Sequence, residues 1–101
     1  MVKHIILWTL HPELSDSEKA AIKADIKKHL EALCGVVPGL VEATVHIDGR
    51  LASSNCDLML DTTLESAEAL KAYAVHPAHA AAADTYVRPY TSQRVCLDFE
   101  L

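Results

Sequence analysis

Two histidines and a tyrosine share one short segment, Tyr73-Ala74-Val75-His76-Pro77-Ala78-His79. A neutral imidazole can accept or donate a proton near neutral pH, so His79 is a candidate for acid–base chemistry. Pro77 fixes its own φ and turns the chain at the end of a predicted helix. His76 near that end can instead interact with the helix dipole as a cap. His79 can likewise be a structural histidine bonded to a backbone carbonyl.

A metal site is a second possible use of these histidines. His76 and His79, together with His4 or Asp84, offer three ligands. However, His-Pro-x-His lacks the helical i, i+4 geometry of His-Glu-x-x-His sites, and spacing ties no cysteine or carboxylate to it. Three glycines exclude a phosphate loop and a dinucleotide fingerprint, and no Gly-x-Ser-x-Gly motif is present. We therefore expect no metal and no cofactor.

A ligand pocket is predicted where the histidines meet the first strand pattern. His4 shares one face of residues 2–10 with Ile6 and Trp8. If that face is directed toward the helices, His4 and His79 can share an apolar slot with Tyr73 at its mouth. The expected lining is His4, Ile6, Trp8, Ile22, Ile26, Leu58, Leu70 and His76. The alternative is that these side chains simply fill the core.

Hydrophobic periodicity predicts the elements that position these residues. The expected strands cover residues 2–10, 40–48, 56–63 and 93–100. A capping box at Ser15 and Glu18 begins a helix that runs to about residue 33, with Ile22, Ile26, Leu30 and Leu33 as its buried stripe. A second helix spans 65–75 with Ala67, Leu70 and Ala74 buried, and residues 79–84 form one more helical turn. On strand 40–48, Val41, Ala43, Val45 and Ile47 share a face.

The order β-α-β-β-α-β predicts one α+β domain over residues 1–101 with a ferredoxin-like fold. Its four-stranded antiparallel sheet has both helices on one face. The other face, which includes Ile5 and Leu7, is largely apolar and has no helix to cover it. An uncovered apolar face predicts a partner, and a two-fold homodimer is the commonest solution.

Composition and charge exclude several classes of protein. Half of the 101 residues are hydrophobic, which excludes a disordered chain. The net charge of −5 argues against nucleic acid as a partner, and no apolar run is long enough to predict a membrane span. Cys34, Cys56 and Cys96 are odd in number and lack zinc-type spacing, which is typical of reduced thiols in a cytoplasmic protein.

Four stretches resemble the stress-responsive dimeric α+β barrel (Dabb) family across almost the whole chain. They are Lys3-His4-Ile5-Ile6-Leu7, Val37-Pro38-Gly39, Leu64-Glu65-Ser66 and Ala72-Tyr73-x-x-His76-Pro77-x-His79. The resemblance implies a ferredoxin-like protomer whose sheet pairs with a second copy to make a barrel. Some plant members bind magnesium through main-chain carbonyls, which the resemblance would put near Gly35 to Pro38.

The family includes the plant olivetolic acid cyclase, which folds a linear polyketide chain by an aldol condensation. The resemblance implies His79 as general base, Tyr73 as the group that holds the carbonyl oxygen, and His4 as a pocket histidine. A further pocket histidine of that enzyme falls on Leu58, and pocket aromatics fall on Ile22 and Ile26. A substrate of this chain would therefore differ.

Three functions follow from these observations: a homodimer that binds a small apolar or polyketide-like ligand, an enolising or monooxygenase-like enzyme that uses His79 and Tyr73, or a purely structural stress protein. A cavity that reaches both His4 and His79 would favour the first two. A filled core with His79 bonded only to backbone would count against the enzyme.

Overall fold

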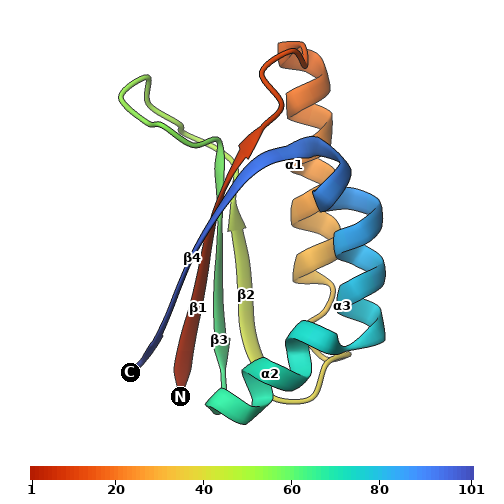
Figure 1. Cartoon of the computed structure of the whole chain (residues 1–101), viewed down its shortest axis with the longest axis vertical. Helices are drawn as coiled ribbons and strands as arrows, with labels where there is room; N and C mark the ends of the chain where they lie inside the picture. The colour runs from red at the N-terminus through yellow and green to blue at the C-terminus, as the bar shows by residue number, and fades with distance from the viewer.

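The computed structural model describes all 101 residues as a four-stranded sheet with helices on one side (Figure 1). The elements are β1 (Val2–Leu10), α1 (Asp16–Glu31), β2 (Leu40–His46), β3 (Leu58–Leu64), α2 (Ala67–Val75), α3 (Pro77–Ala82), the π-helical turn η1 (Ala83–Val87), the 3-10 turn η2 (Arg88–Tyr90) and β4 (Thr91–Glu100). The strand order is β2-β3-β1-β4, and every pairing is antiparallel. The ferredoxin-like fold expected from the sequence is confirmed.

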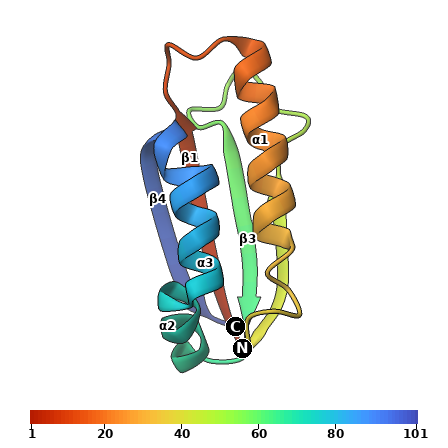
Figure 2. The ribbon, with the colours of Figure 1, turned by 90° about the vertical axis from the view of Figure 1, so that its right-hand side faces the viewer.

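Strand β1 lies between β3 and β4, and its alternation decides which side chains meet the helices. Val2, His4, Ile6, Trp8 and Leu10 are all buried, while the residues between them are only partly covered. Figure 2 shows α1 and α3 running side by side across the sheet face, with α2 below them. His4, Ile6 and Trp8 therefore point into the layer between sheet and helices, as the alternation predicted.

Helix α1 begins as the sequence indicates. The Ser15 side chain accepts from the backbone N–H of Glu18, and the Glu18 carboxylate accepts from the Ser15 N–H. These bonds satisfy orphan donors of the first turn. The predicted stripe is buried throughout, although Leu33 lies in the turn that follows the helix.

The buried face of α2 differs from the predicted stripe. Ala67 and Ala74 are exposed, and Tyr73 is the residue of this helix that reaches the core, with Leu70 partly buried beside it. Ser66 caps the helix at its N-terminus, so the helix begins two residues later than expected. The large aromatic side chain buries more apolar area than either alanine, so it decides which face is turned inward.

The segment after α2 is longer and less regular than predicted. A single helical turn was expected over residues 79–84, but α3, η1 and η2 form one continuous helical run from Pro77 to Tyr90. Strand β2 also departs from its pattern. Its register shifts between Leu40 and Glu42, and this irregularity leaves Val41 46% exposed instead of on the face of Val45.

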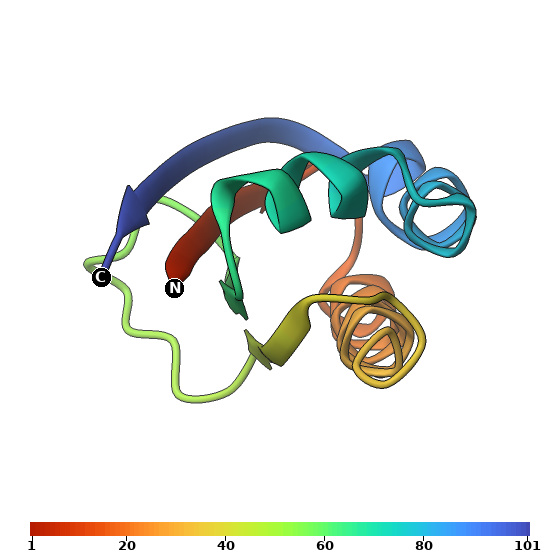
Figure 3. The same cartoon turned by 90° about the horizontal axis from the view of Figure 1, so that it is seen from below.

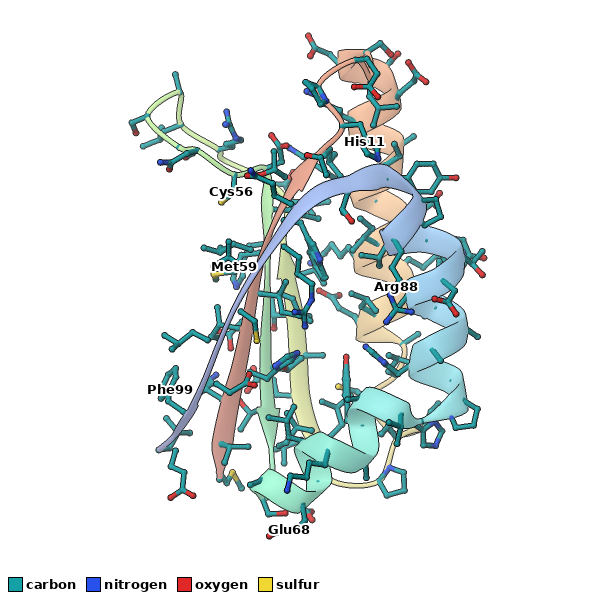
Figure 4. All side chains as sticks on the ribbon, in the orientation of Figure 1. His11, Cys56, Met59, Glu68, Arg88 and Phe99 are labelled. Carbon is teal, nitrogen blue, oxygen red and sulfur yellow. The ribbon has the colours of Figure 1, made fainter.

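The face of the sheet away from the helices carries an uncovered group of apolar residues, here called the apolar sheet face. In the sheet register, Leu7 lies opposite Val95 and Met59, and Ile5 lies opposite Leu97. Figure 3 shows β4 curving around one side of the sheet, and Figure 4 shows Met59 and Phe99 on the side away from the helices. The apolar sheet face consists of Ile5, Leu7, Met59, Val95, Leu97 and Phe99. None of the helices is long and apolar enough to cross a membrane.

Candidate functional site

Three of the sequence-predicted site residues form a chain of aromatic contacts. The ring of Tyr73 lies edge-on to the ring of His79, with centroids 4.4 Å apart and planes at 81°. On its other side Tyr73 meets His4 in a similar arrangement at 6.1 Å. Strand β1, helix α2 and helix α3 supply one residue each, so the fold brings together groups that are far apart in the sequence.

His79 is positioned by the turn between α2 and α3. His76 caps α3, with its Nδ1 accepting from the Ala78 N–H at 3.1 Å, and Pro77 occupies the first turn of that helix. The ring Nδ1 of His79 lies 3.2 Å from the carbonyl oxygen of Ala74. Because a carbonyl only accepts, Nδ1 carries the proton, and the lone pair of the neutral ring is on Nε2.

Burial lowers the pKa of His79, and the nearby positive groups Arg88, His4 and Arg94 lower it further, against the opposing effect of the Ala74 hydrogen bond. The imidazole is therefore neutral at pH 7. A neutral histidine with a free Nε2 is able to accept a proton or a hydrogen bond.

Tyr73 lies deeper than the sequence indicated. We expected its phenol at the mouth of a pocket, but the side chain is 1% exposed. Its hydroxyl is buried and has no hydrogen-bond partner in the protein. Burial raises the pKa of Tyr73 to about 12, with a smaller contribution from the Cys34 thiol group, so the hydroxyl stays protonated. It is a buried donor without an acceptor, which is a rare condition in folded proteins.

His4 is buried on β1 and is held by the neighbouring strand β4. Its Nδ1 lies 2.5 Å from the carboxylate of Asp98, and the Cys96 thiol lies 3.7 Å from the same nitrogen. Burial raises the pKa of Asp98, but hydrogen bonds from His4 and Cys96 outweigh this effect and the net pKa is lowered. The carboxylate accepts a hydrogen bond from the Nδ1–H group, which fixes the tautomer and the orientation of the His4 ring.

The donor atoms of His4, Cys96 and Asp98 all lie within 4.8 Å of one another. Imidazole, thiolate and carboxylate are the ligand types that zinc prefers, so this trio is the group of residues that could hold a metal ion. It shares only His4 with the metal arrangement considered from the sequence. In the structure His76 is occupied in capping α3, and Asp84 forms an ion pair with Arg88.

A cavity of about 310 Å³ lies between the sheet and the α3–η1–η2 segment. Its apolar wall comes from Ile6, Trp8, Leu30, Leu60, Ala83 and Val87. Its polar wall comes from His79, Arg88, Thr91 and Arg94. This volume is at the lower end of the range of small-molecule pockets. Two of its lining residues, Ala83 and Val87, belong to the π-helical turn η1. Such turns are frequent at functional sites.

The expected pocket residues divide into three groups. Ile6, Trp8 and His79 line the cavity, whereas His4 and Tyr73 lie beside it without lining it. The remaining predicted residues are elsewhere: Ile22, Ile26 and Leu58 are packed in the core, Leu70 lines a shallow recess beside β4, and His76 is a cap. The core between sheet and helices is therefore not completely filled at His79.

Sequence reasoning did not select Arg88 and Arg94 as site residues. The alternation of strand 93–100 puts Arg94 on one face with Cys96 and Asp98, and this was the available signal. Arg88 lies in the irregular segment whose geometry the sequence did not indicate. A second hollow of about 330 Å³ at the start of α1 is lined mainly by charges of both signs, including Asp16, Lys19 and Arg50, and has little apolar wall.

Comparison with known proteins identifies relatives of this architecture. The profile of the stress-responsive A/B barrel domain family matches residues 2–101. A dimeric protein of unknown function with a ferredoxin-like fold from Bacteroides fragilis is 26% identical, covering 99% of this chain and 95% of its own, with a TM-score of 0.91. A dimeric ferredoxin-like protein of unknown function from Thermobifida fusca is 25% identical, covering 99% and 90%, with a TM-score of 0.77.

An enzyme shares the fold at lower identity. A hydroxynitrile lyase from Passiflora edulis is 18% identical, covers 99% of this chain and 92% of its own, and has a TM-score of 0.74. At this identity the likeness concerns the fold alone. No protein with a curated description matches the chain.

Proposed function

The chain belongs to the stress-responsive A/B barrel domain family, and from that premise we propose that it works as a homodimer in which each protomer binds one small, mostly apolar molecule. The observation that carries the binding function is the cavity of about 310 Å³ with six apolar lining residues and a histidine. A concave, largely apolar site with a few polar groups is the usual form of a small-molecule pocket.

The apolar sheet face supports the homodimer. Val95 and Leu97 are 62% and 63% exposed, and they continue across the strands into Leu7 and Ile5. Contiguous exposed apolar surface of this kind is typical of an interaction site. The relatives from Bacteroides fragilis and Thermobifida fusca are dimeric.

We also propose that the protein is cytoplasmic, because Cys34, Cys56 and Cys96 are free thiols, which is typical of a reducing compartment.

A cavity-filling variant tests the binding function. Ala83 lines the cavity, so Ala83→Phe would occupy the space that a ligand needs. We expect small acids and ketones, screened by thermal shift, to raise the melting temperature of the wild type. A ligand at 100 times its Kd stabilises by about 2.7 kcal/mol, which is roughly 10 °C or more for a domain of this size. Ala83→Phe should abolish that shift.

Ala72→Phe is the matched control, because Ala72 is exposed on α2 and lies outside the cavity. Native mass spectrometry of the purified protein adds an independent search for molecules that co-purify. If no compound stabilises the wild type and none co-purifies, the binding function is wrong and the purely structural function takes its place. If Ala83→Phe responds as the wild type does, the ligand binds elsewhere.

A second candidate function is an enolising, polyketide-cyclase-like enzyme, and the unpartnered hydroxyl of Tyr73 favours it. In this chemistry Nε2 of His79 takes a proton from the carbon next to a carbonyl, and the electron pair moves onto the oxygen as an enolate. The Tyr73 O–H donates a hydrogen bond to that oxygen. The cavity reaches His79 but not Tyr73, so ligand binding without reaction has the broader support.

Proton exchange tests this second function directly. NMR in deuterium oxide would follow the loss of α-protons from small ketones. An enolising enzyme should accelerate the exchange, and His79→Gln should remove the acceleration by taking away the base. Tyr73→Phe should reduce it by about 10²–10³-fold, as loss of one oxyanion donor does. Exchange in the wild type that is no faster than in buffer would rule the enzyme out for those ketones.

A further inference from the structure

The charged groups that line the cavity are both positive. Arg88 and Arg94 both line it, together with His79 and the hydroxyl of Thr91, and all the other lining residues are apolar. No aspartate or glutamate is among the lining residues. The chain as a whole carries a net charge of −5, so this concentration of positive charge runs against the balance of the molecule.

Arg94 is the arginine in this wall that has no acidic partner. The Arg88 guanidinium forms an ion pair with Asp84, four residues earlier on the same helical run. Arg94 forms no ion pair within 4.0 Å, and its polar neighbour is the thiol of Cys96, a weak acceptor that leaves most of the guanidinium N–H groups unused. Asp98 lies on the same face of β4, but its carboxylate is bound by His4 and Cys96. The Arg94 guanidinium therefore keeps its hydrogen-bond donors available.

The sheet register places Arg94 against the apolar wall. Arg94 of β4 lies directly opposite Trp8 of β1, so the two side chains share the face that looks toward the helices. The positive charges also act on the same enclosed space, since Arg88 and Arg94 both lower the pKa of His79 in addition to burial. The cavity thus has a largely apolar lining with two positive groups beside it.

We propose that the ligand of this cavity is a small apolar carboxylate, with its hydrocarbon part against Trp8 and Ile6 and its carboxylate on Arg94. Arg88 and Thr91 also line the cavity and supply further donors. An arginine fork fits a carboxylate with two parallel hydrogen bonds. At about 30 Å³ for each water-sized unit, a cavity of 310 Å³ holds about ten non-hydrogen atoms, the size of an eight-carbon acid. This inference rests on the binding function proposed above.

Trp8 allows the binding to be measured directly, because it is the one tryptophan of the chain and it lines the cavity. Octanoate and octanamide are matched probes, since they have the same length and shape and differ in charge. Titration of each at pH 7.5, followed by Trp8 fluorescence, gives two dissociation constants. We expect octanoate to bind at least about tenfold more tightly, as for hydrogen bonds to a charged group.

Substitutions of Arg94 assign the preference to its charge. Arg94→Gln should bring octanoate to within about twofold of octanamide and leave octanamide binding unchanged, whereas Arg94→Lys should keep only part of the preference, because lysine keeps the charge but loses the two-pronged fork. Arg88→Gln should have a smaller effect, because Arg88 is shared with Asp84. Lys71→Gln is the control for net charge, since Lys71 is exposed on α2 and outside the cavity. Arg94 makes no hydrogen bond to a main-chain group, so these variants should melt as the wild type does.

The two proposals fail in different ways. Equal binding of octanoate and octanamide by the wild type would overturn the carboxylate inference and leave the apolar cavity in place. A preference for octanoate that survives in Arg94→Gln would also overturn it, because the charge responsible would be elsewhere. Absence of any fluorescence change with either probe at their solubility limits, together with a failed thermal-shift screen, would remove the binding function itself.

Discussion

The hydroxyl of Tyr73 is the least satisfied group among the residues of the candidate site. It is buried without a partner, although the same ring is well packed between His4 and His79. An unsatisfied buried donor costs about 1–3 kcal/mol of stability. A phenylalanine would give the same packing without that cost, so the hydroxyl is a local disadvantage for the folded protein alone. A ligand that accepts its hydrogen bond would remove the disadvantage.

Tyr73→Phe should therefore stabilise the ligand-free protein, by about 1 kcal/mol, because it removes a buried polar atom that has no partner. Chemical denaturation of the two proteins would measure the difference in the free energy of unfolding. Tyr90→Phe is a suitable control, since Tyr90 is 37% exposed and its hydroxyl is not among the buried unpartnered atoms, and it should change stability by less than about 0.5 kcal/mol. A loss of stability in Tyr73→Phe would mean that the hydroxyl already has a partner.

At the scale of elements, the sequence predicted those that depend on a regular period. The alternation of residues 2–10 and the stripe Ile22, Ile26 and Leu30 are found on buried faces, because burial of one face is what generates such a pattern. The capping box at Ser15 was equally readable, since its hydrogen bonds are local. The β-α-β-β-α-β order followed from these elements.

The departures lie where tertiary contacts override local preference. The irregularity that exposes Val41 depends on the register in which β2 pairs with β3. No residue type within β2 indicates this shift in advance. The π-helical turn η1 packs against α1, where Tyr86 stacks on His29 with ring centroids 3.6 Å apart. Such a contact between distant segments leaves no period in the sequence, so residues 85–90 were not predicted as helical.

The candidate site combines both situations. Tyr73 and His79 belong to one short sequence motif and are separated by one capped turn. The motif therefore predicted both as site residues, and their ring centroids lie 4.4 Å apart in the structure. Arg94 reaches the same region through the pairing of β4 with β1, a relation across nearly the full length of the chain. The alternation of the strand assigns Arg94 to a face but does not distinguish it from a solvated arginine.

At the scale of the whole molecule, the proposed homodimer would cover the apolar sheet face, and a single charge tests this proposal. Leu97→Asp places a carboxylate on a residue that is 63% exposed in the protomer, so the protomer itself should still fold. Burying that charge at an interface costs several kcal/mol, and the dimer should weaken by about 100-fold or more. Sedimentation at micromolar concentration should show monomers of Leu97→Asp and dimers of the wild type.

Val75→Asp is the corresponding control, because Val75 is also apolar and is 78% exposed, but it lies on α2 instead of the sheet. It should leave the dimer intact. A wild-type protein that sediments as a stable monomer at tens of micromolar would contradict the homodimer regardless of either variant.

The pairing of β1 with β4 also determines when the sheet can be completed during synthesis of the chain. Val2 lies opposite Glu100, so the strand made first waits for the strand made last of the four. At about 5–20 residues per second, a nascent chain spends several seconds with Trp8 and Ile6 present and the β4 wall absent. During that interval the apolar side chains of β1 that line the cavity lack their β4 neighbour, and the cavity is complete only after Arg94 has left the ribosome.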